Sequence, residues 1–491
     1  MSKDFKIHSV KYNLIMNVIL KMSSFIFPLI TFPYISRVLG PIGNGKISFA
    51  TSIIYYFTIF ATLGIPTYGV KICAQYRDDK EKLTKTVKEL LIIESIAMII
   101  SYIMFFFAMC LIPKLQEEKE LLIINSFTIF LTVFGVEWFY QAIEQYDYIT
   151  FRNLAFKIIS ICLMFLLVHK TEDYILYGCI SVLGTVGSNI LNIIRLNKII
   201  DLKSKHKLEI TRHISPILTL FMLSASTMIY TSLDTVMLGF IKDNQQVGYY
   251  NAATKLKGIL VSLVTALGTV LLPRLSNHLA NKDYDSYIHL IRKSFNFVCL
   301  IAFPLVVFCI FEAEDCIKFL AGNGYGPAVS SMQLISFSIL FIGLSNIIGL
   351  QIFIPTGNEK YTLISTVIGA IVNLILNSIL IPIYSAAGAS VATSIAELSV
   401  LLVQIYFIKN KILELLDIKD IIKSIISVFI SMMVLLICIN YAGFINSIFI
   451  KLCFMAIVFF GIYVCSLLFF KEAIAMEVFY KILSILKISN K

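Results

Sequence analysis

Long apolar segments follow one another along almost the whole chain, and they constrain the fold more than any other feature. A helix that crosses a bilayer needs about 20 mostly apolar residues. Segments of this kind lie near residues 13–36, 45–66, 89–111, 121–143, 149–168, 174–195, 214–238, 248–272, 294–312, 328–354, 361–381, 386–408, 420–440 and 447–470. Of the 491 residues 58% are hydrophobic and only 14% are charged, which excludes an ordinary soluble globule. The sequence predicts an all-α polytopic membrane protein with about fourteen spans.

The basic residues predict how the spans are oriented. The loops 71–88 and 195–212 are rich in lysine and arginine, whereas the loops on the opposite side are short and carry about one or two each. Basic loops remain in the cytoplasm, and an even number of spans places both termini on that side. The net charge of +11 is explained in this way, without nucleic acid as a partner.

A weak internal repeat predicts the domain organisation. Leu39-Gly40 and the segment 45–51 resemble Leu238-Gly239 and the segment 248–254, about 200 residues later. Both copies lie between the first and second helices of a six-helix set. We therefore predict an N-terminal lobe over 1–195, a basic cytoplasmic linker over 196–213, a C-terminal lobe over 214–408, and two extra helices with a tail over 409–491. Parallel repeats of this kind place a shared site near the bilayer midplane.

The first span carries a polar stripe. Steps of three or four residues place Asn13, Asn17, Lys21, Ser24 and Pro28 on one helix face. A lysine at the centre of a span costs about 2.5 to 3.5 kcal/mol on insertion scales. The stripe is therefore expected to face water, protein or ligand.

Other charges lie within predicted spans. Asn251 and Lys255 share a face of the eighth span and match the stripe of the first; the alternative for Lys255 is an ion pair with Asp234. By contrast, Glu94, Arg152 and Lys157 are interpreted as interface anchors or snorkelling side chains.

Several motifs resemble catalytic or metal sites without meeting their requirements. The segment 40–47 nearly spells a phosphate-binding loop, but Ile47 replaces the magnesium-binding Ser or Thr, and two apolar helices flank it. The 10 cysteines form no CxxC pair, and the 6 histidines show no metal spacing. No extramembrane segment is long enough for a catalytic domain. We predict no enzyme activity, no metal and no cofactor.

Six segments together carry a family resemblance. They span 28–41, 247–255, 272–276, 369–377, 381–382 and 388–397. In this order they resemble the Wzx-type polysaccharide repeat-unit flippases of the multidrug/oligosaccharidyl-lipid/polysaccharide exporter superfamily. The resemblance implies two six-helix lobes in a V around a central cavity. Arg37 and Lys255 match basic positions of the family pattern and Glu397 its acidic one, whereas Lys46 stands where an apolar residue is usual.

The resemblance implies a flippase that moves undecaprenyl-diphosphate-linked oligosaccharide repeat units, for O-antigen or capsule, to the outer leaflet of a bacterial plasma membrane by alternating access. The implied partners are that lipid, membrane lipids, a polysaccharide polymerase and a chain-length regulator. We expect Lys21, Arg37 and Lys255 to hold the diphosphate with help from Lys46, because cations bind an anion strongly in a low-dielectric cavity. Sugar or diphosphate oxygens are assigned to Asn13, Asn17 and Asn251, and ion coupling to Asp234 or Glu397.

Two other classes stay open. A cation-coupled drug antiporter of the same superfamily would share the lobes but would favour acidic cavity residues. A membrane polymerase or glycosyltransferase would need a large extracytoplasmic loop.

Overall fold

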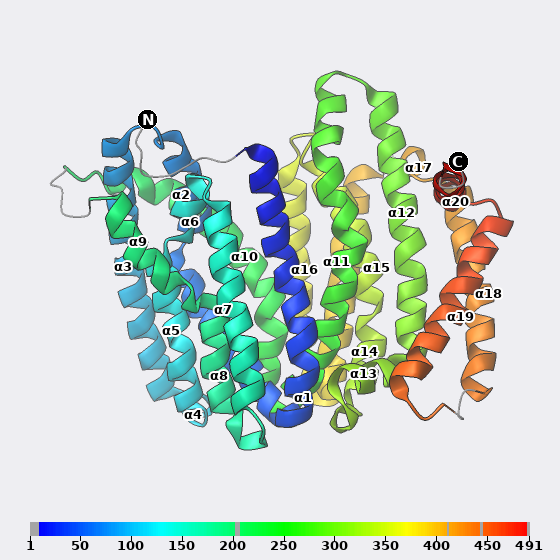
Figure 1. Cartoon of the computed structure of the whole chain (residues 1–491), viewed down its shortest axis with the longest axis horizontal. Coiled ribbons are helices and arrows are strands. Elements are labelled where there is room, and N and C mark those ends of the chain that lie inside the picture. Colours follow the sequence, from blue (N-terminus) through cyan, green and yellow to red (C-terminus); the bar gives the residue numbers. More distant parts are fainter. Residues whose placement is uncertain (1–8, 202–206, 410–411, 442–444, 489–491) are drawn as a thin grey trace. The chain divides into compact units, whose positions relative to one another are not determined.

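The fold is described by a computed structural model that covers residues 9–201, 207–409, 412–441 and 445–488. In this part of the chain every regular element is a helix, as the apolar segments predict. Within each of the two units of the chain, the axes of the long helices are roughly aligned, and the helices lie side by side (Figure 1). Lys203 and Lys205, which contribute to the basic linker, lie outside the described residues.

The chain divides into two compact units, residues 1–248 and 249–491. The first unit contains α1 (Val10–Thr62), α2 (Ile65–Gln75), α3 (Lys80–Leu111), α4 (Pro113–Gln116), α5 (Lys119–Gly135), α6 (Glu137–Ala142), α7 (Tyr146–Leu167), the 3-10 turn η1 (Thr171–Asp173), α8 (Tyr174–Val182), the π-helical segment η2 (Leu183–Gly187), α9 (Asn189–Ile199) and α10 (Thr211–Ile241).

The division falls near the start of α11 (Asn244–Ala280), whose remaining residues belong to the second unit. That unit continues with α12 (Tyr284–Phe311), α13 (Ala313–Ala321), η3 (Asn323–Tyr325), α14 (Ala328–Ile335), α15 (Phe337–Asn346), the π-helical segment η4 (Ile347–Phe353), α16 (Glu359–Ile408), α17 (Ile412–Leu415), α18 (Ile418–Tyr441), α19 (Ile448–Phe469) and α20 (Ala473–Ile488).

Two of the longest helices are pairs of predicted spans joined at a sharp bend. In α1 the backbone leaves helical geometry at Gly40, with φ of 67° and ψ of −177°, just before Pro41. A positive φ suits glycine, and proline is favoured in the first turn of the helix that follows. In α16 the corresponding bend is at Ser385, three residues after Pro382. The predicted breaks after 36 and after 381 are therefore bends within continuous helical chain.

Eleven helical stretches among the described residues are long and apolar enough to cross a membrane. Two of them contain the bends at Gly40 and Ser385, and α10, which is not among them, covers the predicted span 214–238. The all-helical, multi-pass architecture is confirmed, while the total of about fourteen spans stays a prediction.

The unit boundary and the predicted lobe boundary differ by one helix. We place α10 in the C-terminal lobe, yet it packs against α1 and α2 in the first unit. The close contact lies at Gly64, where a Cβ atom would come within 2.7 Å of Leu220 Cβ and Phe221 N. The predicted six-helix lobes stay a prediction about function. Each unit has its own apolar core, the first around Ile65, Leu90 and Phe139.

Candidate functional site

The predicted cations are distributed over both units. Lys21, Arg37 and Lys46 lie on α1 in the first unit, whereas Lys255 lies on α11 in the second. Their predicted convergence on one diphosphate therefore stays a prediction, and each side chain is described within its own unit.

The polar stripe of α1 passes from a buried end to an exposed middle. The helix starts at the N-cap Ser9, whose side chain accepts a hydrogen bond from the Tyr12 amide at 3.3 Å. Asn13 is buried, and its Nδ2 donates to Glu144 Oε2 at 3.2 Å. Asn17 is half-buried, and Lys21 is exposed. Within the described chain Lys21 has no ion pair or hydrogen bond, so its positive charge is not matched by a carboxylate.

The other two α1 cations differ in their surroundings. Arg37 is exposed at the surface of its unit, and one guanidinium N–H donates to the Pro33 carbonyl at 2.6 Å. Lys46 follows the Gly40 bend, and its Nζ lies 2.8 Å from Glu118 Oε1, 3.3 Å from the Tyr174 hydroxyl and 4.4 Å from the centre of that ring. The Glu118 side chain is only 5% exposed. The charge of Lys46 is therefore already balanced within the protein.

On α11, Lys255 is exposed and has no ion pair or hydrogen bond with a described residue of the second unit. Asn251, one turn earlier, is half-buried, and its carbonyl accepts from the Thr254 hydroxyl at 3.0 Å. Because Asp234 belongs to the first unit and Lys255 to the second, the alternative pairing of these two residues stays a prediction.

Both candidate ion-coupling acids are buried. Asp234 on α10 is 4% exposed. Glu397 on α16 is 8% exposed and stands one turn after Thr393, whose hydroxyl is 2.9 Å from the Tyr250 hydroxyl. Their ion-coupling role stays a prediction.

The interpretation of Arg152 and Glu94 as interface anchors or snorkelling side chains is wrong, because both side chains are buried within the protein. Arg152 NH2 lies 3.0 Å from Glu137 Oε2, and its NH1 donates to Asn189 Oδ1 at 2.9 Å. Glu94 Oε2 accepts from Trp138 Nε1 at 3.3 Å. A buried ion is tolerated when it is paired and hydrogen-bonded. The sequence signal was the presence of Glu137 and Asn189 in neighbouring spans, but only tertiary structure shows that they meet Arg152.

Lys157, for which the sequence predicts an interface anchor or snorkelling side chain, contacts two serines of α1. It lies on α7, and its Nζ donates to Ser23 Oγ at 2.9 Å and to Ser24 Oγ at 3.1 Å, while the Phe27 ring centre is 5.5 Å away. Ser24 belongs to the polar stripe. Among the described residues no carboxylate lies within 4.0 Å of Lys157, so two hydroxyls solvate its charge without neutralising it.

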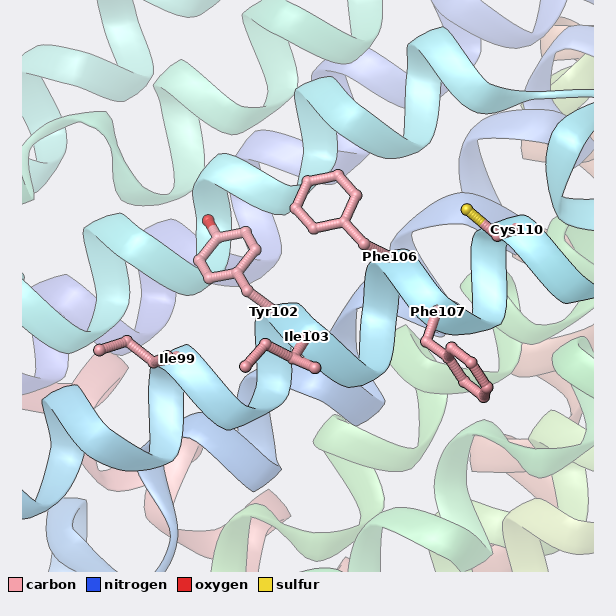
Figure 2. A pocket seen from close by; sticks show the side chains of 6 residues that line it. All are labelled: Ile99, Tyr102, Ile103, Phe106, Phe107 and Cys110. Atoms are coloured by element: carbon pink, nitrogen blue, oxygen red, sulfur yellow. The ribbon is translucent and has the colours of Figure 1, made fainter.

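A shallow recess on α3 is apolar and does not resemble a headgroup site. Figure 2 shows the side chains that line it, all from this one helix: Ile99, Tyr102, Ile103, Phe106, Phe107 and Cys110. The Tyr102 hydroxyl donates to the Ser126 carbonyl at 2.8 Å and is therefore already occupied. This surface suits hydrocarbon chains of the bilayer. In the described part of the chain, no group of three or more His, Cys, Asp or Glu side chains could hold a metal ion.

Comparison with known proteins identifies the family. The model of the family described as "Polysaccharide biosynthesis protein" matches residues 10–279, and the MatE model matches residues 219–379. A "Putative O-antigen transporter" of Escherichia coli K12 is 25% identical over 82% of this chain and 97% of its own length.

Two solved structures share the fold. A structure of the lipid II flippase MurJ in an inward closed conformation has a TM-score of 0.74 and 19% identity, and it covers 94% of this chain and 100% of its own. An inward-facing multidrug resistance MATE family transporter has a TM-score of 0.59 and 12% identity, over 82% of this chain and 98% of its own. These relatives are transporters and flippases by name, which confirms the predicted class of multi-pass, non-enzymatic membrane transporter. Because the first family model covers more than half of the chain, this protein belongs to the polysaccharide biosynthesis protein family.

Proposed function

We propose that this protein flips undecaprenyl-diphosphate-linked oligosaccharide repeat units from the cytoplasmic to the outer leaflet of a bacterial plasma membrane, by alternating access. The family membership and the name of the Escherichia coli relative support an O-antigen or capsule substrate. We also propose cytoplasmic termini, from the basic loops, and a polysaccharide polymerase and a chain-length regulator as downstream partners.

The chemistry of the substrate defines what such a site must provide. A sugar chain with a diphosphate cannot cross about 30 Å of hydrocarbon unless its hydrogen bonds are replaced, because each unsatisfied polar group costs several kcal/mol. A polar path through the protein replaces these bonds while the isoprenoid tail stays in lipid. The inside-negative potential favours outward movement of an anion by about 2.3 kcal/mol per charge per 100 mV.

The observation that carries the proposal is a set of cations without acidic partners. Lys21, Lys157 and Lys255 lie in predicted spans, and none of them has an ion pair with a described residue of its own unit. An unmatched cation at this depth is costly, and an anionic ligand removes that cost. We assign the diphosphate to Lys21, Lys255 and Arg37, with Lys157 as an additional cation beside the stripe.

The remaining predicted residues take secondary roles. Lys46 assists diphosphate binding only weakly, because its positive charge is already neutralised by Glu118. Asn17 and Asn251 are half-buried and contact sugar or diphosphate oxygens. Asn13, whose amide donates to Glu144, is assigned a contact with sugar or diphosphate oxygens.

A drug antiporter is the second candidate, because the MatE model matches residues 219–379 and acids are buried in both units. In such a protein Asp234 and Glu397 would bind the coupling cation. The two functions are separated by substrate: proteoliposomes containing an antiporter exchange cationic dyes for protons, whereas a flippase leaves such dyes unmoved and translocates a lipid diphosphate.

The test is lipid flipping in proteoliposomes by Lys21→Ala and Lys255→Ala variants, reconstituted in equal amounts. We expect both to flip a fluorescent undecaprenyl diphosphate oligosaccharide at least tenfold more slowly, which corresponds to about 1.4 kcal/mol in the barrier. Lys257→Ala is the matched control, because it removes a lysine from another face of α11. Wild-type rates in both site variants would contradict the proposed site.

A further inference from the structure

The chain after the last predicted span forms a helix that lies across the spans. Helices α18 and α19 are long and apolar enough to cross a membrane, and α20 follows α19 after residues 470–472. In Figure 1 α18 and α19 are seen from the side, whereas α20 is seen end-on, so its axis crosses theirs steeply. Three residues reach at most about 11 Å. Helix α20 therefore stays close to the end of α19, which it contacts.

The turn that precedes α20 is held in place by hydrogen bonds. Glu472 is buried, and its Oε2 accepts from the Ala475 amide at 2.7 Å. This bond satisfies one of the free amides that every helix has in its first turn. From α18, Lys423 Nζ donates to the Lys471 carbonyl at 3.0 Å. The direction of α20 is therefore set by the folded second unit.

Two further contacts fix the rotation of α20 about its own axis. Ala475 packs against the apolar cluster around Tyr463 and Leu467 of α19. Glu477 Oε2 lies 2.5 Å from Lys293 Nζ of α12. Residues two apart in a helix point about 200° away from each other, so these contacts use opposite faces of α20. The face that carries Ala475 is therefore turned toward the span helices.

The face that carries Ala475 is apolar along the helix but is covered only at its start. By helical spacing, three large apolar side chains share this face: Val478, Phe479 and Ile482. Each of them is between 41% and 51% exposed. Three polar side chains occupy the opposite face: Glu477, Lys481 and Ser484. Contiguous exposed apolar side chains with a polar rim mark a surface that contacts a membrane or another protein.

We propose that α20 is an interfacial helix that holds Val478, Phe479 and Ile482 among the acyl chains of the leaflet in which α19 ends. Its apolar face continues the surface of that span, because Phe469, the last residue of α19, is 81% exposed. Helices of this kind bury an apolar face about 5–10 Å into the headgroup boundary and keep a charged face in water. Tyr480 is exposed at the boundary between the two faces, where tyrosine is enriched in membrane proteins. This contact needs the multi-pass architecture but not the proposed substrate.

The test measures the depth of α20 in the full-length protein, reconstituted in vesicles of phosphatidylethanolamine and phosphatidylglycerol, with exposed native cysteines replaced by alanine. A single spin label is placed on the apolar face, at residue 478 or 482. The matched controls carry the label on the polar face, at residue 481 or 484. All four positions are exposed, so a label there leaves the packed unit intact. Collision rates are recorded with oxygen, which concentrates in hydrocarbon, and with a nickel chelate, which stays in water.

We expect oxygen collisions to exceed nickel collisions at residues 478 and 482, and the order to be reversed at residues 481 and 484. Nickel collisions as frequent at 482 as at 481 would place the apolar face in water and overturn the proposal. Low collision rates with both reagents at 482 would mean that protein covers the face, which would also overturn it. Spin–spin broadening in the same samples would then identify a second copy of this chain as the cover. None of these results depends on whether the protein flips lipid.

Discussion

Adding one methyl group at Gly45 or Gly248 tests the close backbone contacts that these glycines make, Gly45 with Asn244 and Gly248 with Pro41. Carbon atoms pack at about 3.5 Å or more. An alanine at position 45 would place its Cβ 2.5 Å from the Asn244 carbonyl carbon and closer still to the carbonyl oxygen, so the two helices must separate by more than about 1 Å. The corresponding separation at Gly248, from 2.7 Å, is slightly smaller. Overpacking of a tight contact costs about 1 to 3 kcal/mol. Alanine has a better helix propensity than glycine, which offsets about 0.5 to 1 kcal/mol of this cost. The net effect on the free energy of unfolding is therefore destabilising.

Gly258 provides a control, because alanine at that position is expected to raise stability or leave it unchanged. Gly258 lies in the same helix as Gly248, and an added Cβ there meets no atom within 4 Å. Thermal unfolding of the purified proteins in detergent should therefore rank the variants with Gly45→Ala least stable, then Gly248→Ala, then wild type, with Gly258→Ala at or above wild type. If Gly248→Ala has the same melting temperature as Gly258→Ala, the inference that Gly248 is needed for close helix approach is refuted.

Two further predictions concern charges. Lys46→Met should lower stability by about 1 to 3 kcal/mol, because it leaves the buried Glu118 carboxylate without its cation. The double variant with Glu118→Gln should regain most of this stability, and a single variant with the melting temperature of the wild type would contradict the pairing. In the linker, the hydrogen bond from Lys85 lowers the pKa of Glu209, so the stabilising contact is complete above the ordinary carboxylate range and is lost as pH falls below about 4. Amide exchange at Glu209 should therefore be slower in wild type than in Lys85→Met at neutral pH, and the two should coincide in acid.

Much of the fold follows from the sequence, because hydrocarbon permits few solutions. A spanning segment must satisfy its own backbone hydrogen bonds and must therefore be helical, so apolar length alone locates most spans. The bend of α1 is predictable for the same reason: Gly40-Pro41 combines a residue that accepts a positive φ with one that starts a helix. The placement of α10 was not predictable, because it depends on the fit of that helix against Gly64.

The candidate site was less predictable, because spacing along one helix reveals a face but not what that face meets. The stripe from Asn13 to Ser24 does lie along α1, yet its partners Glu144 and Lys157 come from residues more than a hundred positions away. Its charge and its place near the end of a span predict an interface anchor or snorkelling side chain at Arg152, whereas the fold buries it in an ion pair with Glu137.

The presence or absence of a carboxylate partner distinguishes cations that stabilise the fold from cations that can bind an anionic ligand. Arg152 and Lys46 are matched by Glu137 and Glu118, so removing either cation exposes an unpaired acid and acts first on stability. Lys21 has no such acid among the described residues, so its removal leaves nothing unpaired in the empty protein and acts first on a bound anion. Uncharged variants at matched positions should therefore lose stability, whereas those at unmatched positions should keep it and lose transport. A cation neutralised by its own protein has little attraction left for a ligand, so we expect Lys21 to contribute more to diphosphate binding than Lys46, which Glu118 neutralises.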